Sequence, residues 1–202
     1  MITETLEEIA MMHVDGLIAK ARSGDQKAFG KIMGLWFKRI YNFSFKYFGD
    51  HDIAMEVSQK TFIAVYQNIR KLQDTSKFKS WLYRIAWNQC HEENRKISRK
   101  TWFSFFASRE AHEVEEFHLT PERGIHAREL NEVVGELLKS LPEEQRTILI
   151  LKEYEGLKFR EIADLLGISE NTAKSRLYYA LKALRNLIED YNIDINSFLN
   201  GK

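Results

Sequence analysis

The most constraining part of this chain is the segment of residues 156–184, which has the pattern of two helices joined by a sharp turn. Apolar residues recur at helical spacing on both sides of Gly167. Glycine tolerates the left-handed backbone with which many helices end, and the hydroxyl of Ser169 is placed to cap the first free amides of the next helix. The segment therefore predicts a helix-turn-helix, a motif that lays its second helix in the major groove of DNA.

The second helix of this motif has an apolar face and a polar, basic face. The apolar face consists of Ala173, Leu177, Ala180 and Leu184, and Leu181 belongs to the same apolar run. The candidates for DNA contact lie opposite this face and on its flanks: Asn171, Lys174, Ser175, Arg176, Tyr178, Tyr179 and Lys182. Such a face suits the width and the hydrogen-bonding groups of a major groove.

Position on the helix predicts different roles within this set. Ser175 and Tyr178 lie nearest the centre of the outward face, so we expect them to reach base edges or thymine methyl groups. Lys174 and Arg176 flank the centre on opposite sides, so we expect them to contact phosphates. The alternative, a solvated helix of an ordinary bundle, is disfavoured by the combination of turn, cap and basic face.

Composition and length exclude several classes of protein. The 202 residues are 44% hydrophobic and 29% charged, which is ordinary for one or two globular domains. No apolar run approaches the roughly 20 residues that span a bilayer, and the N-terminus lacks the basic flank and long apolar core of a secretory signal. Cys90 is the only cysteine, so no intramolecular disulfide is possible, and we expect a buried thiol. We therefore expect a cytoplasmic chain without a membrane segment.

No catalytic or metal-binding constellation has the required spacing. His91, Glu92 and Glu93 begin like the helix of a zinc protease, but Arg95 occupies the place of the second histidine. We therefore expect no enzymatic activity, no metal and no cofactor.

Charge and proline placement divide the chain. Basic residues gather within 84–100 and glutamates within 110–122, where Pro121 interrupts helical continuity. Pro142 precedes two glutamates, which predicts a helix that starts with proline at its first position. No strand alternation is present, so we expect an all-α fold. The predicted parts are an N-terminal helical domain over residues 10–97, an acidic linker over 98–126 and a C-terminal helical domain over 127–191.

Residues 53–72 form a second amphipathic pattern. The inner stripe consists of Ala54, Val57, Thr61, Val65, Ile69 and Leu72, with Phe62 at its edge. The other face carries Glu56, Gln59, Lys60, Ile63 and Gln67. Ile63 is an anomaly among polar neighbours: scattered exposed apolar residues are common, but an apolar residue on an outer helix face is also typical of a partner-binding patch.

A loop over residues 73–77 leads into a third helix that starts near Phe78. Its expected inner stripe consists of Leu82, Ile85, Ala86 and Gln89, and its outer side carries Arg84, Trp87, His91 and Arg95. Cations interleaved with an exposed tryptophan suit phosphate contact and stacking on an unpaired base. The alternative is that Trp87 packs against a neighbouring helix, as we expect for Phe78 and Trp81.

Several of these segments, taken in order, resemble one known family. SWLYRIAWN at residues 80–88, preceded by EVSQKTF at 56–62 and followed by LPEEQRTILILKEYEGLKFREIADLLGISENTAKSRL from residue 141, is similar to the extracytoplasmic-function group of bacterial RNA polymerase sigma factors. The resemblance runs from about residue 15 to about residue 187, apart from the linker. It implies a two-domain initiation factor that binds the beta and beta-prime subunits of core RNA polymerase, melts the −10 element and reads the −35 element.

The resemblance also assigns roles by position. The EVSQKTF helix resembles the family's polymerase-binding helix, with Glu56, Gln59, Lys60 and Ile63 on the binding face. The residues implied at the −10 element are Asp74, Lys77, Lys79, Arg84, Trp87, His91 and Arg95, where residues 73–79 resemble the base-capturing loop. The outward face of the second helix of the helix-turn-helix is implied at the −35 element. An anti-sigma factor is a further possible partner, and a stand-alone helix-turn-helix regulator is the alternative function.

The chain departs from the family pattern at a few positions. Lys60 stands where glutamate is usual, and Lys158 where a capping serine or threonine is common. Ala173 replaces the usual valine, and Tyr179 and Leu181 stand where basic residues are frequent. These last two departures change the chemistry available for the −35 contact.

Overall fold

The computed structural model describes residues 14–107 and 127–190, and their side chains within 14–99 and 133–190. Within these ranges every regular element is helical, which confirms the predicted fold class. The N-terminal part forms α2 (Val14–Arg22), α3 (Gln26–Phe48), α4 (His51–Asn68), the short 3-10 turns η1 (Ile69–Lys71) and η2 (Thr75–Lys77), and α5 (Phe78–Ala107). The C-terminal part forms α6 (Ala127–Ser140), α7 (Glu143–Leu149), the π-helical turn η3 (Ile150–Tyr154), α8 (Phe159–Leu166) and α9 (Glu170–Asp190).

The described residues pack as two units. One contains residues 14–45 and 50–92, and the other contains 46–49 together with the residues from 93 onward. Helix α5 continues to Ala107, past residue 97, where the sequence predicted the end of the N-terminal domain. The rest of the predicted linker, residues 108–126, lies outside the described part of the chain. None of the helices in the described ranges combines the length and the apolar character needed to cross a bilayer.

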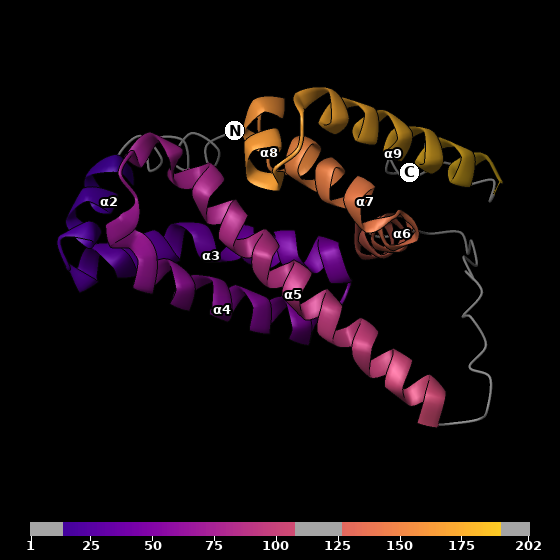
Figure 1. Cartoon of the computed structure of the whole chain (residues 1–202), viewed down its shortest axis with the longest axis horizontal. Helices are drawn as coiled ribbons and strands as arrows, with labels where there is room; N and C mark the ends of the chain where they lie inside the picture. Colours follow the sequence, from indigo (N-terminus) through magenta and orange to yellow (C-terminus); the bar gives the residue numbers. More distant parts are fainter. Residues whose placement is uncertain (1–13, 108–126, 191–202) are drawn as a thin grey trace. The chain divides into compact units, whose positions relative to one another are not determined.

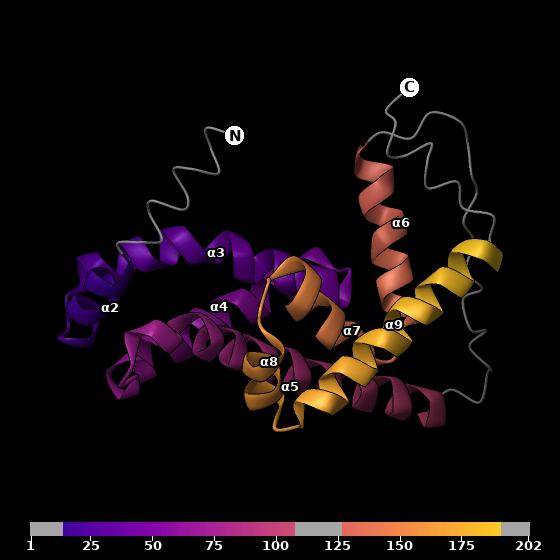
Figure 2. The same cartoon turned by 90° about the horizontal axis from the view of Figure 1, so that it is seen from above.

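The first unit is built around a cluster of aromatic side chains. Helix α3 runs in one direction, α4 returns beside it and α5 runs diagonally across both (Figures 1 and 2). Trp36 on α3 packs edge-on against Phe78 and Tyr83 of α5, with ring centroids 5.7 and 6.4 Å apart. Phe43 makes a similar contact with Tyr83 at 5.5 Å. Because all four rings are buried, they fix the rotation of α5 against α3.

Helix α4 buries the stripe that its sequence predicts. Ala54, Val57, Thr61, Val65, Ile69 and Leu72 are all buried, together with Phe62. Asp50 caps the helix by accepting a hydrogen bond from the Ile53 amide at 2.9 Å. The buried hydroxyls of Ser58 and Thr61 donate back to carbonyls one turn earlier, so their burial leaves no donor unsatisfied.

The inner face of α5 is rotated from the predicted one. Leu82 and Ala86 are buried as expected, but Tyr83 and Cys90 complete the buried face, while Ile85 and Gln89 are only half-buried. The aromatic contacts of Tyr83 with α3 account for this rotation. The expectation of a buried thiol at Cys90 is confirmed. Phe78 is buried as predicted, and Trp81 is half-buried with its ring 6.0 Å from that of Phe78.

The loop between α4 and α5 is a structured segment. The Asp74 carboxylate accepts hydrogen bonds from the Ser76 amide at 3.0 Å and from the Ser76 hydroxyl at 2.6 Å, and so caps η2. Helix α2 packs against both η1 and η2, and Arg22 donates a hydrogen bond to the Gln73 carbonyl at 3.3 Å. The loop is therefore held by its own cap and by α2 behind it.

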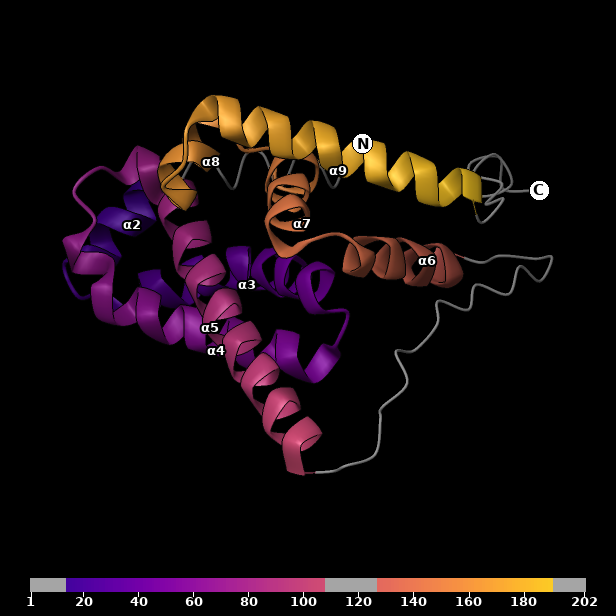
Figure 3. The ribbon, with the colours of Figure 1, turned by 45° about the vertical axis from the view of Figure 1, so that its right-hand side comes forward.

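The second unit contains the predicted helix-turn-helix. Gly167 ends α8 in the left-handed region, with φ 68°, and the Ser169 hydroxyl accepts a hydrogen bond from the Thr172 amide at 3.0 Å. Helix α9 lies across α7 and α8 (Figure 3). Ala173, Leu177 and Ala180 are buried, which confirms three members of the predicted apolar face.

Three details of the second unit differ from the sequence prediction. Pro142 precedes α7 as its N-cap residue, with φ −52° and ψ 141°, so the helix starts one residue later than expected. Leu184 is half-buried, and Leu181, which we placed in the apolar run, is 48% exposed. Leu181 follows the buried Ala180 by one residue, a rotation of about 100° that takes it off the packed stripe.

The cap at η2 predicts the titration of Asp74. The two hydrogen bonds from Ser76, with a smaller contribution from nearby Lys77, lower the pKa of the Asp74 carboxyl from its ordinary value of 3.8. Because the pKa is lower in the folded chain, the cap is present above pH 3.8 and is lost as the pH falls through the folded pKa. We expect the NMR titration midpoint of Asp74 to lie below 3.8 and to rise in Ser76→Ala. A midpoint that is the same in both proteins would contradict the proposed cap.

Candidate functional site

The outer face of α4 presents the four residues predicted for polymerase binding. Ile63 is 57% exposed, and Glu56 and Gln59 are exposed beside it. Lys60 is half-buried, and its ammonium group pairs with the Glu56 carboxylate at 2.5 Å. The pair joins residues one helical turn apart and balances the two charges, so the most distinctive feature of this face is the exposed isoleucine.

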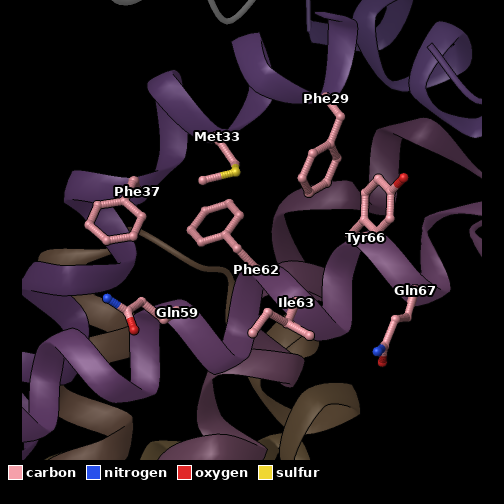
Figure 4. Close-up of a pocket in the computed structure, with 8 residues that line it drawn as sticks. All are labelled: Phe29, Met33, Phe37, Gln59, Phe62, Ile63, Tyr66 and Gln67. Atoms are coloured by element: carbon pink, nitrogen blue, oxygen red, sulfur yellow. The ribbon is translucent and has the colours of Figure 1, made fainter. Parts of the chain in front are cut away.

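Ile63 lies at the edge of an apolar groove between α3 and α4. The groove has a volume of about 440 Å³ and is lined by Phe29, Met33, Phe37, Gln59, Phe62, Ile63, Tyr66 and Gln67. Figure 4 shows the α3 side chains on one side and the α4 side chains opposite them. The rings of Phe37 and Phe62 stack with centroids 5.7 Å apart, and Phe29 meets Tyr66 edge-on at 5.0 Å. An apolar floor with amide side chains at its rim suits the insertion of apolar side chains from a partner helix.

The sequence pattern predicted that Gln59, Ile63 and Gln67 lie on the outer face of α4, but it predicted neither Tyr66 nor the α3 half of the groove. Phe29, Met33 and Phe37 lie next to the buried stripe of α3, where a helical pattern assigns them to the core. Their half-buried state becomes visible only when α4 is placed beside α3. The signal in the sequence was Tyr66, an aromatic residue three positions after Ile63, and the structure shows that it is exposed.

The predicted −10 residues divide between the loop and one side of α5. Lys77 is exposed and Lys79 is half-buried, while the Asp74 carboxylate is engaged in the cap of η2. This geometry gives Asp74 a role in shaping the loop.

On α5, Trp87 and His91 form a stacked pair. Their ring centroids are 5.5 Å apart and their planes are inclined by 19°. Both residues are half-buried, and the exposed Arg84 and Arg95 lie along the same side of the helix. The Trp87 indole is therefore partly covered by His91 and partly exposed to solvent. An aromatic pair flanked by guanidinium groups can accept an unpaired base and hold the neighbouring phosphates.

The predicted −35 residues lie on α9, and all but one are exposed. The exposed ones are Asn171, Lys174, Ser175, Tyr178, Tyr179 and Lys182. Arg176 is half-buried on the flank that faces α7, and it forms an ion pair with Glu144 at 2.5 Å. On the opposite flank, the Lys174 ammonium lies 5.8 Å from the ring centroid of Phe159 on α8. Each flanking cation is thus in contact with the helix beside it.

The departures from the family pattern also have structural counterparts. Lys158 precedes α8 without a side-chain cap, but its amide donates to the Glu161 carboxylate at 2.7 Å, so the start of the helix keeps one of its capping bonds. Tyr179 and Leu181 are exposed, so the outer surface of α9 is more apolar than a basic helix would be.

In the described part of the chain, no three His, Cys, Asp or Glu side chains come together in a way that could hold a metal ion.

Comparison with known families matches both parts of the chain. Residues 36–100 match the family Sigma-70 region 2, and residues 131–184 match the family Sigma-70, region 4. Together the two matches span more than half of the chain.

Individual relatives match over nearly their whole length. The ECF RNA polymerase sigma factor SigW of Bacillus subtilis is 29% identical over 184 residues, which cover 89% of this chain and 98% of the relative. The ECF RNA polymerase sigma-E factor of Haemophilus influenzae is 29% identical over 178 residues, which cover 86% and 94%.

Solved structures share the fold. CnrH in complex with the cytosolic domain of CnrY has a TM-score of 0.64 and 22% identity, over 87% of this chain and 97% of that one. The sigma factor RpoE of Bartonella quintana, in complex with the anti-sigma factor NepR, has a TM-score of 0.65 and 23% identity, over 83% and 99%.

The ordered helices, the helix-turn-helix and the two matched regions thus lead to one assignment. The chain belongs to the extracytoplasmic-function sigma factors, the non-enzymatic initiation factors that direct bacterial RNA polymerase to promoters.

Proposed function

We propose that the α3–α4 groove and the outer face of α4 bind the beta-prime clamp helices of core RNA polymerase, with further contacts to beta elsewhere on the chain. The observation that carries this proposal is Ile63, which is exposed at the edge of an apolar groove. An isoleucine side chain exposed to water does not stabilise the fold, whereas a partner helix that covers it buries apolar surface. Glu56, Gln59 and Lys60 supply polar contacts around it.

We propose that the loop and the outer side of α5 engage the −10 element. Lys77, Lys79, Arg84 and Arg95 supply charge for the phosphates, and the stacked Trp87 and His91 offer an aromatic surface to a base that has left the duplex. Asp74 contributes through the shape of the loop.

We propose that α9 reads the −35 element. Ser175 and Tyr178 lie at the centre of its outward face and reach base edges or thymine methyl groups, with Asn171, Tyr179 and Lys182 around them. Lys174 and Arg176 contact phosphates from the two flanks. Support for this division comes from the position of each side chain on the packed helix.

The remaining features of the proposal concern organisation and partners. We propose two functional domains, over residues 10–97 and 127–191, joined by residues 98–126, of which 98–107 continue α5. An anti-sigma factor is a proposed partner because the related RpoE is bound to one. The proposed location is the cytoplasm, where bacterial promoters are transcribed. A stand-alone regulator is disfavoured because it would leave the region 2 segment without a use.

The polymerase-binding face is tested by Ile63→Asp. A buried apolar contact replaced by a charge is expected to weaken core binding about tenfold or more. The melting temperature should change little, because an exposed substitution usually costs within about 0.5 kcal/mol. Binding of the full chain to core polymerase without DNA is the measurement, and Tyr66→Ala should weaken it as well.

Met55→Asp is the matched control for this prediction. Met55 is on the same helix and is 40% exposed, but it does not line the groove. If Ile63→Asp and Met55→Asp affect core binding equally, the face is assigned incorrectly.

The −10 surface is tested by Trp87→Ala in the holoenzyme. Stacking of a base on an aromatic ring contributes about 1 to 3 kcal/mol, and that contribution appears only after strands separate. Open-complex formation should therefore fall more than closed-complex binding, and a premelted bubble template should restore part of it. Trp87→Phe should keep much of the activity. An equal loss on duplex and bubble templates, with a lower melting temperature, would show that Trp87 acts through folding.

A further inference from the structure

The two cations that flank the outward face of α9 are held differently. Lys174 is exposed, and its ammonium group lies 5.8 Å from the ring centroid of Phe159. Arg176 has 27% of its side chain exposed, and its Nη2 atom meets the Glu144 carboxylate at 2.5 Å. Glu144 belongs to the first turn of α7, and 67% of its side chain is exposed. The ion pair thus joins a largely exposed carboxylate on α7 to a partly buried guanidinium group on α9.

This geometry leaves part of the guanidinium group for a second anion. A guanidinium is planar and carries five N–H donors, so one carboxylate can occupy one edge while a phosphate takes another. Lysine has a single rotating ammonium group and gains less from such support. An arginine fixed on one edge also loses less conformational entropy when it binds DNA, because its rotamer is already set.

We propose that Glu144 is a positioning residue that fixes Arg176 for contact with one phosphate beside the −35 element. The inference rests on the proposed −35 role of α9. Glu144 itself touches no base or phosphate. Its effect is to direct the Arg176 contact to the register in which Ser175 and Tyr178 meet their bases, so that it favours the correct sequence over other DNA.

Two other roles for the Glu144 carboxylate predict different effects on DNA binding. A carboxylate that merely competed with phosphate would weaken binding to all DNA, and its removal would raise the affinity for every sequence. A carboxylate that only joined α7 to α9 would affect melting and leave DNA discrimination alone. The ratio of specific to non-specific affinity separates these roles from positioning, because a general change in charge affects both affinities alike.

The test uses the holoenzyme and a duplex from a promoter identified by transcription of genomic fragments. Affinity is measured for the −35 duplex and for the same duplex with a scrambled −35 element, at two salt concentrations. Glu144→Ala should lower the ratio of the two affinities about threefold, the scale of a partly exposed ion pair. Arg176→Ala removes the phosphate contact itself, so it should weaken binding to both duplexes and reduce the salt slope by about one. The ratio should also fall, because the contact that sets the register of Ser175 and Tyr178 is lost.

Double variants test whether Glu144 acts through Arg176. In the Arg176→Ala background, Glu144→Ala should leave the ratio unchanged, whereas its effect should add to that of Lys174→Ala. Glu153→Ala is the matched control, since it removes an exposed carboxylate from the same unit and should raise both affinities alike. Glu144→Gln preserves the shape of the side chain and serves as the second variant if Glu144→Ala melts earlier.

The outcomes separate this inference from the proposed function. If the wild-type holoenzyme does not discriminate between the two duplexes, the −35 role of α9 itself is wrong. If the wild type discriminates and both Glu144 variants behave like Glu153→Ala, only the positioning role is wrong. A ratio that rises in Glu144→Ala would show that Glu144 withdraws Arg176 from DNA.

Discussion

The period of the α-helix determines which surfaces of this chain are available for function. Each amphipathic helix buries one stripe, and the side chains about half a turn away must then face outward. In α4 the buried stripe that includes Val57 and Val65 leaves Ile63 outside. In α9 the burial of Ala173, Leu177 and Ala180 turns Ser175 and Tyr178 toward solvent. The candidate interfaces are therefore consequences of how each helix packs.

Features that depend on one helix were predictable from the sequence. The stripe of α4, the left-handed Gly167 and the Ser169 cap all follow from local rules of spacing and capping, and all are present. Features that depend on two segments were not predictable. Tyr83 replaced Ile85 on the buried face of α5 because of its contacts with α3, and the groove beside Ile63 needed Phe29, Met33 and Phe37 from α3. No periodicity within a single helix contains these pairings.

Ion pairs within one helix were predictable from the sequence, whereas ion pairs between two helices were not. The Glu56–Lys60 pair spans four residues of one helix, which a sequence can suggest. The Glu144–Arg176 pair joins residues 32 positions apart. The sequence pattern predicted Arg176 as an exposed cation, whereas the structure shows that it is partly buried and paired with a carboxylate. The lysine at position 60, where the family usually has glutamate, makes the α4 face nearly neutral, so that apolar contact with Ile63 and its groove dominates the proposed binding. Tyr179 and Leu181 are exposed and uncharged, so in the proposed −35 contact base and methyl contacts carry more of the binding relative to phosphate contacts.

As an extracytoplasmic-function sigma factor, this chain gives core RNA polymerase access to specific promoters. Run-off transcription of genomic fragments by purified core enzyme, with and without the full chain, is the measurement of this function. Discrete transcripts should appear from a limited set of fragments, and only when the chain is present. If transcription is the same with and without the chain, under conditions in which another sigma factor activates the same core enzyme, the chain does not act as an initiation factor at these promoters.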